Sequence, residues 1–332
     1  MVNNEKILVL GSNSFGGSSY INYALDKGYK IIGINRSVES HSCFHPYKNN
    51  KNKNKYLSYN LHLITDNEKI ISILEKEKPQ YIVDFAGQGM VAESWNDPIL
   101  WFETNLISKI KIHEYLKNKN WLKKYIRIST PEVYGSNEGK VNEDQNLNPT
   151  TPYAVSHAAV DLSLKSYFNN YNFPIIIGRF ANFYGPGQQI YRIIPKTILY
   201  AKSNKKLPLH GGGKSMRAFI FNNDVSNAID KLITKGKLGE TYNFSPTNFI
   251  SIKELVVKIL NIMELPYESS VFETEDRISK DHSYFMDTKK AENFLNWTPF
   301  VSLENGINST IEWVNKNYSI LNQMPAIYQH KM

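Results

Sequence analysis

Cysteine and long apolar runs are nearly absent from this sequence. Its 332 residues contain one cysteine, Cys43, which excludes a disulfide framework and suits a reducing compartment. No run of 18 apolar residues occurs, which argues against a membrane-spanning helix. The first residues lead directly into KILVLGS, so we expect no signal peptide. These absences predict a cytoplasmic protein that does not associate with a membrane.

Positive charge is in excess, but it is not concentrated in a binding patch. The formal net charge is +8 and the pI is about 9.1. Four of the lysines lie in the low-complexity stretch KNNKNKNK at 48–55, which is typical of a solvated loop. Elsewhere lysine and glutamate are mixed, as in ILEKEKP. We therefore expect no nucleic-acid partner, and we assign no metal site.

Short apolar strands alternate with helices over the first half of the chain. Such alternation is typical of parallel βαβ units with helices on both faces of the sheet. We predict an α/β protein with a Rossmann-type doubly wound parallel sheet, which binds ligands beyond the carboxyl ends of its strands. Strands are predicted at 6–10, 29–34, 56–59, 81–86, 125–129 and 174–180, and helices at 15–25, 67–76, 101–118 and 153–170.

The alternation weakens after about residue 185. Pro186, Pro195, Pro208 and the glycines at 211–213 interrupt shorter elements there. We predict a dinucleotide-binding domain over 1–180, to which a segment at about 218–250 returns. A smaller mixed α/β substrate domain is predicted mainly over 181–330.

A glycine-containing turn follows the first predicted strand. In KILVLGSNSFGG, Gly11, Ser14 and Gly17 have the spacing of the dinucleotide fingerprint, with serine in the middle position. Gly11 permits a tight turn and Gly17 a close helix–strand contact, while the amides at the helix start meet a pyrophosphate. We assign cofactor binding to this turn and to the ends of the next strands, at Gly11, Asn13, Ser14, Phe15, Gly17, Asn35, Arg36, Ser37, Asn60, Leu61, Phe85 and Ala86.

The second strand ends without the carboxylate that usually binds the ribose 2′-hydroxyl of NAD. Asn35, Arg36 and Ser37 stand there instead. An arginine together with a hydroxyl suits a 2′-phosphate through charge-assisted hydrogen bonds. NADP is therefore favoured over NAD.

Four further segments carry a resemblance to a known family. IRISTPEVYGS, TPYAVSHAAVDL, GRFANFYGPGQ and KSMRAFIFNNDV follow one another in order, and ETYNFS, the DR at 276–277 and LNWTP extend the match over nearly the whole chain. Together they resemble the extended short-chain dehydrogenase/reductases, and within them the nucleotide-sugar 4,6-dehydratases most.

The resemblance implies a reaction at C4, C5 and C6 of a nucleotide-diphosphate sugar. A tyrosine takes the C4 hydroxyl proton while a tightly held, recycled dinucleotide accepts the C4 hydride and later returns it to C6. The 4-ketone acidifies the C5 proton, which a base removes as the C6 hydroxyl leaves. By motif position the catalytic residues are Tyr153, Thr130 as the hydroxyl bonded to the C4 oxygen, and Glu132 as the C5 base.

Pro131 is the first departure from the family pattern. Many dTDP-glucose 4,6-dehydratases have aspartic acid there to protonate the departing C6 oxygen, and proline donates no proton. The GDP-mannose 4,6-dehydratases have Thr-Ser-Glu and use the glutamate alone. A protonated Glu132 is therefore expected to deliver its proton to the C6 oxygen.

His157 is the second departure, because it stands four residues after Tyr153 where the family has lysine. That lysine hydrogen-bonds the nicotinamide ribose and holds positive charge near the tyrosine. His157 lies one helical turn after Tyr153 and on the same face, so its imidazole can donate to the ribose. Its charge is expected to depend on pH. We expect a slower but functional site, in which His157→Lys raises turnover and flattens the pH dependence between about 6 and 8.

The substrate residues are assigned from the same motif positions. They are Gln88, Thr130, Asn182, Arg192, Arg217 and Arg277. The planar fork of arginine pairs with phosphate oxygens, as a nucleotide diphosphate requires. The family also commonly dimerises through two helices, which match 101–118 and 153–170, so a homodimer is implied.

Three alternatives remain open at this point. A 4-epimerase of the same family needs Thr130 and Tyr153 but no C5 base, and a nucleotide-sugar decarboxylase is a further option. A non-catalytic dinucleotide-binding protein is the alternative from another class. Retention of Tyr153, Thr130 and Glu132 together argues against it.

Overall fold

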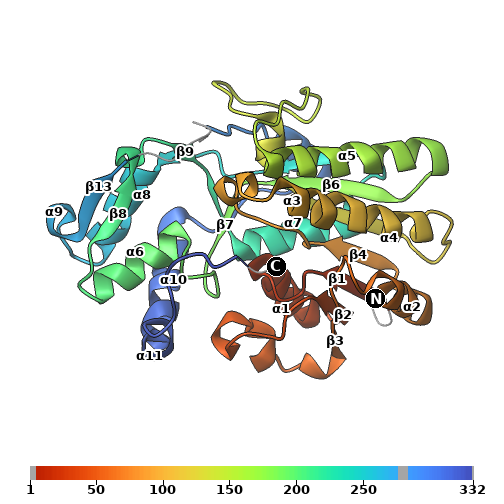
Figure 1. Ribbon diagram of the computed structural model, residues 1–332, viewed down its shortest axis with the longest axis horizontal. Helices are drawn as coiled ribbons and strands as arrows, with labels where there is room; N and C mark the ends of the chain where they lie inside the picture. The colour runs from red at the N-terminus through yellow and green to blue at the C-terminus, as the bar shows by residue number, and fades with distance from the viewer. Residues whose placement is uncertain (1–4, 276–282, 331–332) are drawn as a thin grey trace.

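A seven-stranded parallel sheet forms the centre of the molecule (Figure 1). The computed structural model describes residues 5–275 and 283–330. The strand order is β11-β6-β5-β4-β1-β2-β3, with all neighbours parallel, as a doubly wound sheet requires. The strands are β1 (Lys6–Leu10), β2 (Lys30–Asn35), β3 (Tyr56–Asn60), β4 (Tyr81–Asp84), β5 (Lys124–Ser129), β6 (Ile175–Phe180) and β11 (Thr241–Phe244). The predicted fold class is confirmed.

The central strands are apolar on both faces because helices cover both. In β1, Ile7 and Val9 enter one buried cluster, whereas Leu8 and Leu10 enter the other. Successive side chains of a strand point to opposite faces, so a continuous apolar run fills two cores. That property made the strands recognisable in the sequence.

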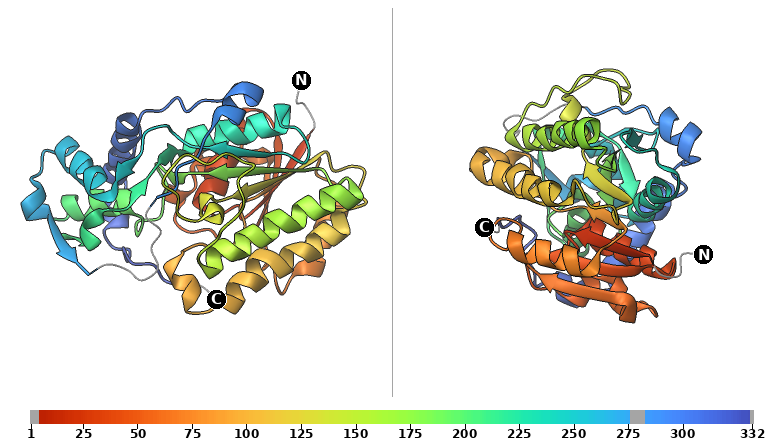
Figure 2. Two further views of the ribbon diagram at one scale, coloured as in Figure 1. Left: turned by 90° about the horizontal axis from the view of Figure 1, so that it is seen from above. Right: turned by 90° about the vertical axis from the view of Figure 1, so that its right-hand side faces the viewer.

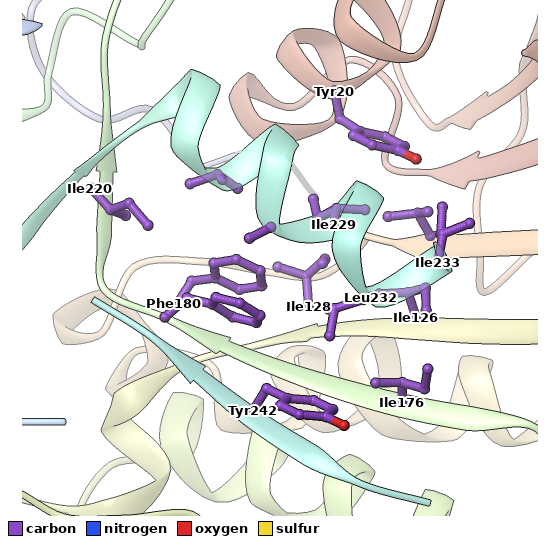
Figure 3. Packing of buried hydrophobic residues seen from close by; sticks show 14 of the residues in the cluster. Tyr20, Ile126, Ile128, Ile176, Phe180, Ile220, Ile229, Leu232, Ile233 and Tyr242 are labelled. Atoms are coloured by element: carbon purple, nitrogen blue, oxygen red, sulfur yellow. The ribbon is translucent and has the colours of Figure 1, made fainter. Parts of the chain in front are cut away.

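The two helical layers use different elements. Helices α1 (Phe15–Asp26) and α7 (Asn222–Lys235) pack together on one face, where Ile229 and Leu232 of α7 lie near β5 and β6 and Tyr20 extends from α1 (Figure 3). On the other face lie α2 (Asn67–Glu77), α4 (Ser108–Leu116) and α5 (Pro152–Tyr171).

The predicted single helix at 101–118 is interrupted. The structure has α3 (Pro98–Phe102), a π-helical turn at Glu103–Ile107 and then α4. The wider turn lets Asn105 and Lys109 both be fully buried. π-Turns inside helices often mark functional sites. The expectation of one regular helix was therefore wrong, because buried polar contacts override a regular helical period.

A second region lies beyond one end of the sheet, as two further views show (Figure 2). Its helices pack around their own apolar clusters. The chain returns from it to the sheet through α7 and β11. Its elements are β7 (Asn182–Tyr184), α6 (Ile193–Lys202), β8 (Leu207–His210), β9 (Met216–Arg217), β10 (Phe219–Phe221), β12 (Ile250–Ser251), α8 (Ile252–Ile262), α9 (Tyr267–Ser270), β13 (Val271–Thr274), α10 (Leu303–Lys316) and α11 (Tyr318–Leu321).

The helices do not resemble membrane spans. Across residues 5–275 and 283–330, none combines the length and the apolar character needed to cross a bilayer.

Candidate active site

The turn between β1 and α1 has the shape of a diphosphate cradle. Gly11 has a φ of +78°, and a Cβ there would lie 2.9 Å from the Ala86 nitrogen. A Cβ on Gly17 would lie 2.4 Å from the Gly11 carbonyl oxygen. The Ser14 hydroxyl caps α1 by accepting from the Gly17 amide at 3.0 Å, and the first turn contains no acidic residue. The helix N-terminus therefore offers amides and a partial positive charge to an anion.

The end of β2 is tied to this turn by amide side chains. The Asn13 amide donates to the Asn35 Oδ1 at 2.7 Å and to the Ser37 carbonyl at 2.8 Å. Asn35 in turn donates to the Ser12 hydroxyl at 3.1 Å, and its carbonyl accepts from the Leu61 amide at 2.8 Å. Ser12 was not predicted. These bonds join the ends of β1, β2 and β3, where Asn60 also lies, at one edge of the sheet.

Arg36 faces the C-terminal segment of the chain. It is half-buried; burial lowers the pKa of Arg36 and raises that of Tyr328, and the charge of each group opposes the shift of the other. The Tyr328 ring lies 5.3 Å from that of Tyr191, edge to face, and His330 stacks on Trp101 at 5.2 Å. Sequence reasoning missed this segment because no motif marks it.

The loop after β4 is anchored by a buried asparagine. Asn105 accepts from the Gln88 amide at 2.7 Å, donates to the Gln88 carbonyl at 3.2 Å and donates to the Ser156 hydroxyl at 2.9 Å. Phe85 packs beneath α1, with its ring 6.2 Å from that of Tyr20. Asn105 was not predicted, although an asparagine in an apolar helical segment was a usable signal.

Thr130, Glu132 and Tyr153 come together from three elements. Thr130 follows β5, Glu132 lies in a 3-10 turn, and Tyr153 is the second residue of α5. The Thr130 hydroxyl donates to the Glu132 carboxylate and also hydrogen-bonds with Tyr153. The start of α5 is fixed because the Thr151 hydroxyl caps it, accepting from the Ala154 amide at 3.2 Å.

Pro131 begins the 3-10 turn that carries Glu132, over Pro131–Tyr134. The fixed φ of proline suits the first residue of a helical turn, where no amide hydrogen is needed. The side chain is buried. Pro131 therefore holds the direction of Glu132 rather than supplying a proton.

The surroundings of Tyr153 both raise and lower the pKa of its phenol. Burial, and then the charge of Glu132, raise its pKa well above the ordinary value. The hydrogen bond with Thr130 and the positive charges of Arg192 and Arg127 lower the pKa. The site thus contains groups that favour the phenolate, and two of them are arginines.

His157 does not behave as expected from the sequence. Burial, followed by the charges of Arg127 and Lys109, lowers its pKa well below the ordinary value. Its Nδ1 lies 2.9 Å from the Arg127 Nη2, and its ring lies 4.5 Å from that of Tyr153. The expectation that its charge varies between pH 6 and 8 was wrong, because burial and then the adjacent Arg127 charge favour the neutral imidazole.

The predicted substrate residues are spread over several elements. Arg192 reaches the loop after β4, since a Cβ on Gly89 would lie 3.8 Å from its Nη2. Asn182 lies on β7, and Arg217 lies on β9 with its guanidinium 4.6 Å above the Tyr284 ring. Arg277 lies outside the described residues. Within the part of the chain that the structure describes, no group of three or more His, Cys, Asp or Glu side chains has the arrangement of a metal site.

Known proteins match this chain over nearly its whole length. A family model described as GDP-mannose 4,6 dehydratase matches residues 8–310. The dTDP-D-glucose 4,6-dehydratase of Mus musculus is 32% identical, over 95% of this chain and 90% of its own. That of Dictyostelium discoideum is 30% identical, over 95% and 83%. The resemblance expected from the motifs is confirmed.

Solved structures agree in fold. The dTDP-glucose 4,6-dehydratase of Bacillus anthracis, in complex with NAD, superposes with a TM-score of 0.86 at 29% identity, covering 95% of this chain and 98% of its own. DesIV of Streptomyces venezuelae, with NAD and TYD bound, gives 0.86 at 26%, with the same coverage. A UDP-glucose 4-epimerase of Thermotoga maritima gives 0.86 at 24% identity, over 94% and 99%, which supports the fold alone.

Proposed function

This chain belongs to the GDP-mannose 4,6-dehydratase family, and from that premise we propose that it converts a nucleotide-diphosphate sugar into its 4-keto-6-deoxy product. It is an NAD(P)-dependent nucleotide-sugar dehydratase by its relatives. The observation that carries the proposal is the meeting of Glu132 with Thr130 and Tyr153. Oxidation at C4 needs only Thr130 and Tyr153. Elimination of water across C5 and C6 also needs a base, which is the task of Glu132.

The three side chains have separate tasks. Tyr153, as phenolate, takes the proton of the C4 hydroxyl, and Thr130 donates a hydrogen bond to the C4 oxygen. The turn between β1 and α1 and the end of β2 would hold the dinucleotide, which would supply hydride transfer at C4 and C6 of the sugar. Glu132 takes the C5 proton and then gives it to the departing C6 oxygen, because Pro131 has no proton to donate. The nearby cations that lower the pKa of Tyr153 favour the first of these transfers.

Replacement of Glu132 tests the proposal. We expect Glu132→Gln to reduce loss of water from the substrate about 100- to 10,000-fold, as for other general acid–base groups. Mass spectrometry of products from a panel of nucleotide sugars measures this, and deuterium uptake at C5 should fall in parallel. Glu138→Gln, an exposed carboxylate in the following loop, is the matched control and should dehydrate normally.

Other products would select the alternatives. A 4-epimerase returns a sugar of unchanged mass with a different NMR spectrum, and a decarboxylase loses carbon dioxide. If protein that retains its cofactor gives no product from any sugar of the panel, it is a non-catalytic dinucleotide-binding protein. Full dehydration by Glu132→Gln would refute the assignment of the base.

For the cofactor we propose NADP. The end of β2 presents Arg36, half-buried, with Ser37 beside it and no carboxylate in the Asn35–Ser37 stretch. A guanidinium pairs well with a 2′-phosphate. We expect Arg36→Gln to weaken NADP binding about tenfold and NAD binding little. Titration of tryptophan fluorescence measures both, and tighter binding of NAD than NADP by the unaltered protein would contradict the proposal.

For the substrate we propose that residues 181–330, apart from the segment at about 218–250, hold the nucleotide diphosphate. Residues 1–180 then hold the cofactor. The arginine positions Arg192, Arg217 and Arg277, together with Asn182, are proposed to bind the nucleotide portion. Gln88, whose backbone is anchored by Asn105, is proposed to contact the sugar.

We also propose that the protein is a cytoplasmic homodimer. Large apolar side chains are exposed on the two helices that the family uses for pairing. Leu162 is 58% exposed on α5, and Ile107 is 49% exposed just before α4. Val155, Tyr171 and Ile99 are also exposed on α5 and α3. Burying these side chains against a second copy would remove the apolar area from water.

A further inference from the structure

Four buried ionisable side chains lie together beside Tyr153, on four different elements. They are Asp84 at the end of β4, Lys109 on α4, Arg127 on β5 and His157 on α5, and none is more than 8% exposed. The Lys109 Nζ lies 2.7 Å from the Asp84 Oδ2, and the Arg127 Nη1 lies 3.4 Å from the same oxygen. The other terminal nitrogen of Arg127 contacts His157 at 2.9 Å. Arg127 therefore bridges the carboxylate and the imidazole.

The direction of the hydrogen bond between Arg127 and His157 determines the tautomer of the imidazole. A guanidinium has only donors and stays protonated in proteins, so the His157 Nδ1 must accept. A ring that accepts at Nδ1 and is neutral carries its hydrogen on Nε2. His157 is thereby held as a neutral donor, with its N–H on the side of the ring away from Arg127.

Arg127 is the fixed cation of this cluster. Burial and the charge of Arg127 lower the pKa of Lys109 to about 8, so the lysine is the cation that loses its proton first. Asp84 is shared among Lys109, Arg127 and the Tyr125 hydroxyl, which donates at 3.0 Å. Asp161 lies farther from Arg127, at 3.8 Å. Arg127 thus lies next to both carboxylates and, as a guanidinium, keeps its positive charge when Lys109 loses its proton.

We propose that Arg127 is a positioning residue for the reaction, which supplies the permanent positive charge beside Tyr153 and fixes His157 as an Nε2–H donor. The family's lysine performs both tasks with one side chain. In this chain they are divided, with the charge on β5 and the hydrogen-bond donor on α5. This inference rests on the proposed dehydratase function, because it assigns a task in proton removal by Tyr153.

Several other groups face this cluster, and any pH dependence must be judged against them. Besides the cluster members Asp84 and Lys109, they are His113, Glu132, Asp161, Arg192 and, through its pairing with Asp161, Arg179. Arg179 is the informative comparison. It is 1% exposed, as Arg127 is, and it pairs with Asp161 at 3.2 Å and with the Tyr134 hydroxyl at 2.7 Å.

Nitrogen-15 NMR of histidine-labelled protein without ligands tests the first part of the proposal. His157→Asn assigns the signal. We expect the unaltered protein to show one neutral tautomer with hydrogen on Nε2 through pH 6–8. Arg127→Met should mix the tautomers or let His157 titrate, whereas Arg127→Lys, which keeps the charge, should shift the spectrum less. An unchanged His157 spectrum in Arg127→Met would overturn this part, whatever the protein catalyses.

Kinetics test the second part. We expect Arg127→Met to lower kcat about tenfold or more. In the pH profile of kcat, the apparent pKa of the group that must be deprotonated, which we assign to Tyr153, should rise by about one unit. The double variant with His157→Lys should recover most of both losses, since a lysine restores a cation one turn from Tyr153. His157→Lys alone should not raise kcat, because the cation is already present; this replaces the expectation from the sequence that the same variant raises turnover.

Arg179→Met is the matched control for a purely structural arginine. It should lower thermal stability as Arg127→Met does, but it should leave the pH profile in place. If Arg127→Met behaves like Arg179→Met, and His157→Lys fails to restore activity, the proposed charge role is wrong. If the unaltered protein dehydrates no nucleotide sugar, the proposed function fails instead, and the NMR result still decides the arrangement of Arg127 and His157.

Discussion

At the scale of single residues, burial determines which protonation state several side chains keep. His113 is fully buried among the rings of Tyr125, Tyr167 and Phe173, and burial lowers its pKa to about 3. In the unfolded chain a histidine titrates near 6.5. Between these values the unfolded state binds a proton that the folded state does not, so stability is lost as the pH falls.

We expect His113→Phe to remove part of this acid sensitivity. Each buried neutral histidine contributes a loss of up to about 1.4 kcal/mol per pH unit in this range. Urea unfolding at a series of pH values from 7 to 4 measures the slope, which should be shallower in the variant. His41→Phe, at an exposed position, should keep the original slope. An equal slope in His113→Phe would show that His113 is protonated in the folded protein.

At the scale of elements, the contact between β1 and α1 leaves no room for a side chain. The Gly17 position is limited by the Gly11 carbonyl oxygen, which a Cβ would approach to 2.4 Å. Substitution must therefore push the first turn of α1 away from the strand. The amides that we assign to phosphate binding belong to this turn, so binding and packing depend on the same atoms.

We expect Gly17→Ala to weaken dinucleotide binding at least about tenfold, because the displaced backbone amides no longer point toward the diphosphate. Tryptophan fluorescence titration with either dinucleotide measures this. Gly139→Ala, where an added Cβ meets nothing within 4 Å, is the control and should bind normally. Normal binding by Gly17→Ala would show that the turn does not hold the cofactor.

At the scale of the whole molecule, the exposed apolar face of α5 distinguishes a monomer from a dimer. We expect Leu162→Glu to convert a dimer into monomers, because a charge buried in such an interface is unpaired. Sedimentation velocity measures the mass. Phe294 is 71% exposed but lies outside the proposed interface, so Phe294→Glu should leave the dimer intact. A monomeric unaltered protein, or a dimeric Leu162→Glu, would refute the proposed interface.

The strands and the three residues that we propose as catalytic, Thr130, Glu132 and Tyr153, were accessible to sequence reasoning because their signals are local. The strands of a doubly covered sheet are short continuous apolar runs, and β1 to β6 all begin and end within two residues of their predicted bounds. Thr130, Glu132 and Tyr153 were found by motif. Their convergence follows from the sheet, because β5 and the start of α5 meet at one edge.

The amino-acid sequence by itself determined the fold class, the glycine turn and the family, since each depends on residues close together along the chain. The tertiary structure decided the state of His157, because Arg127 is 30 residues away and nothing local indicates that the two touch. It also decided that Asn105 in the π-turn and Lys109 on α4 are buried, and that Tyr328 lies near Arg36. Burial and distant charges set protonation, and both exist only after the chain has folded.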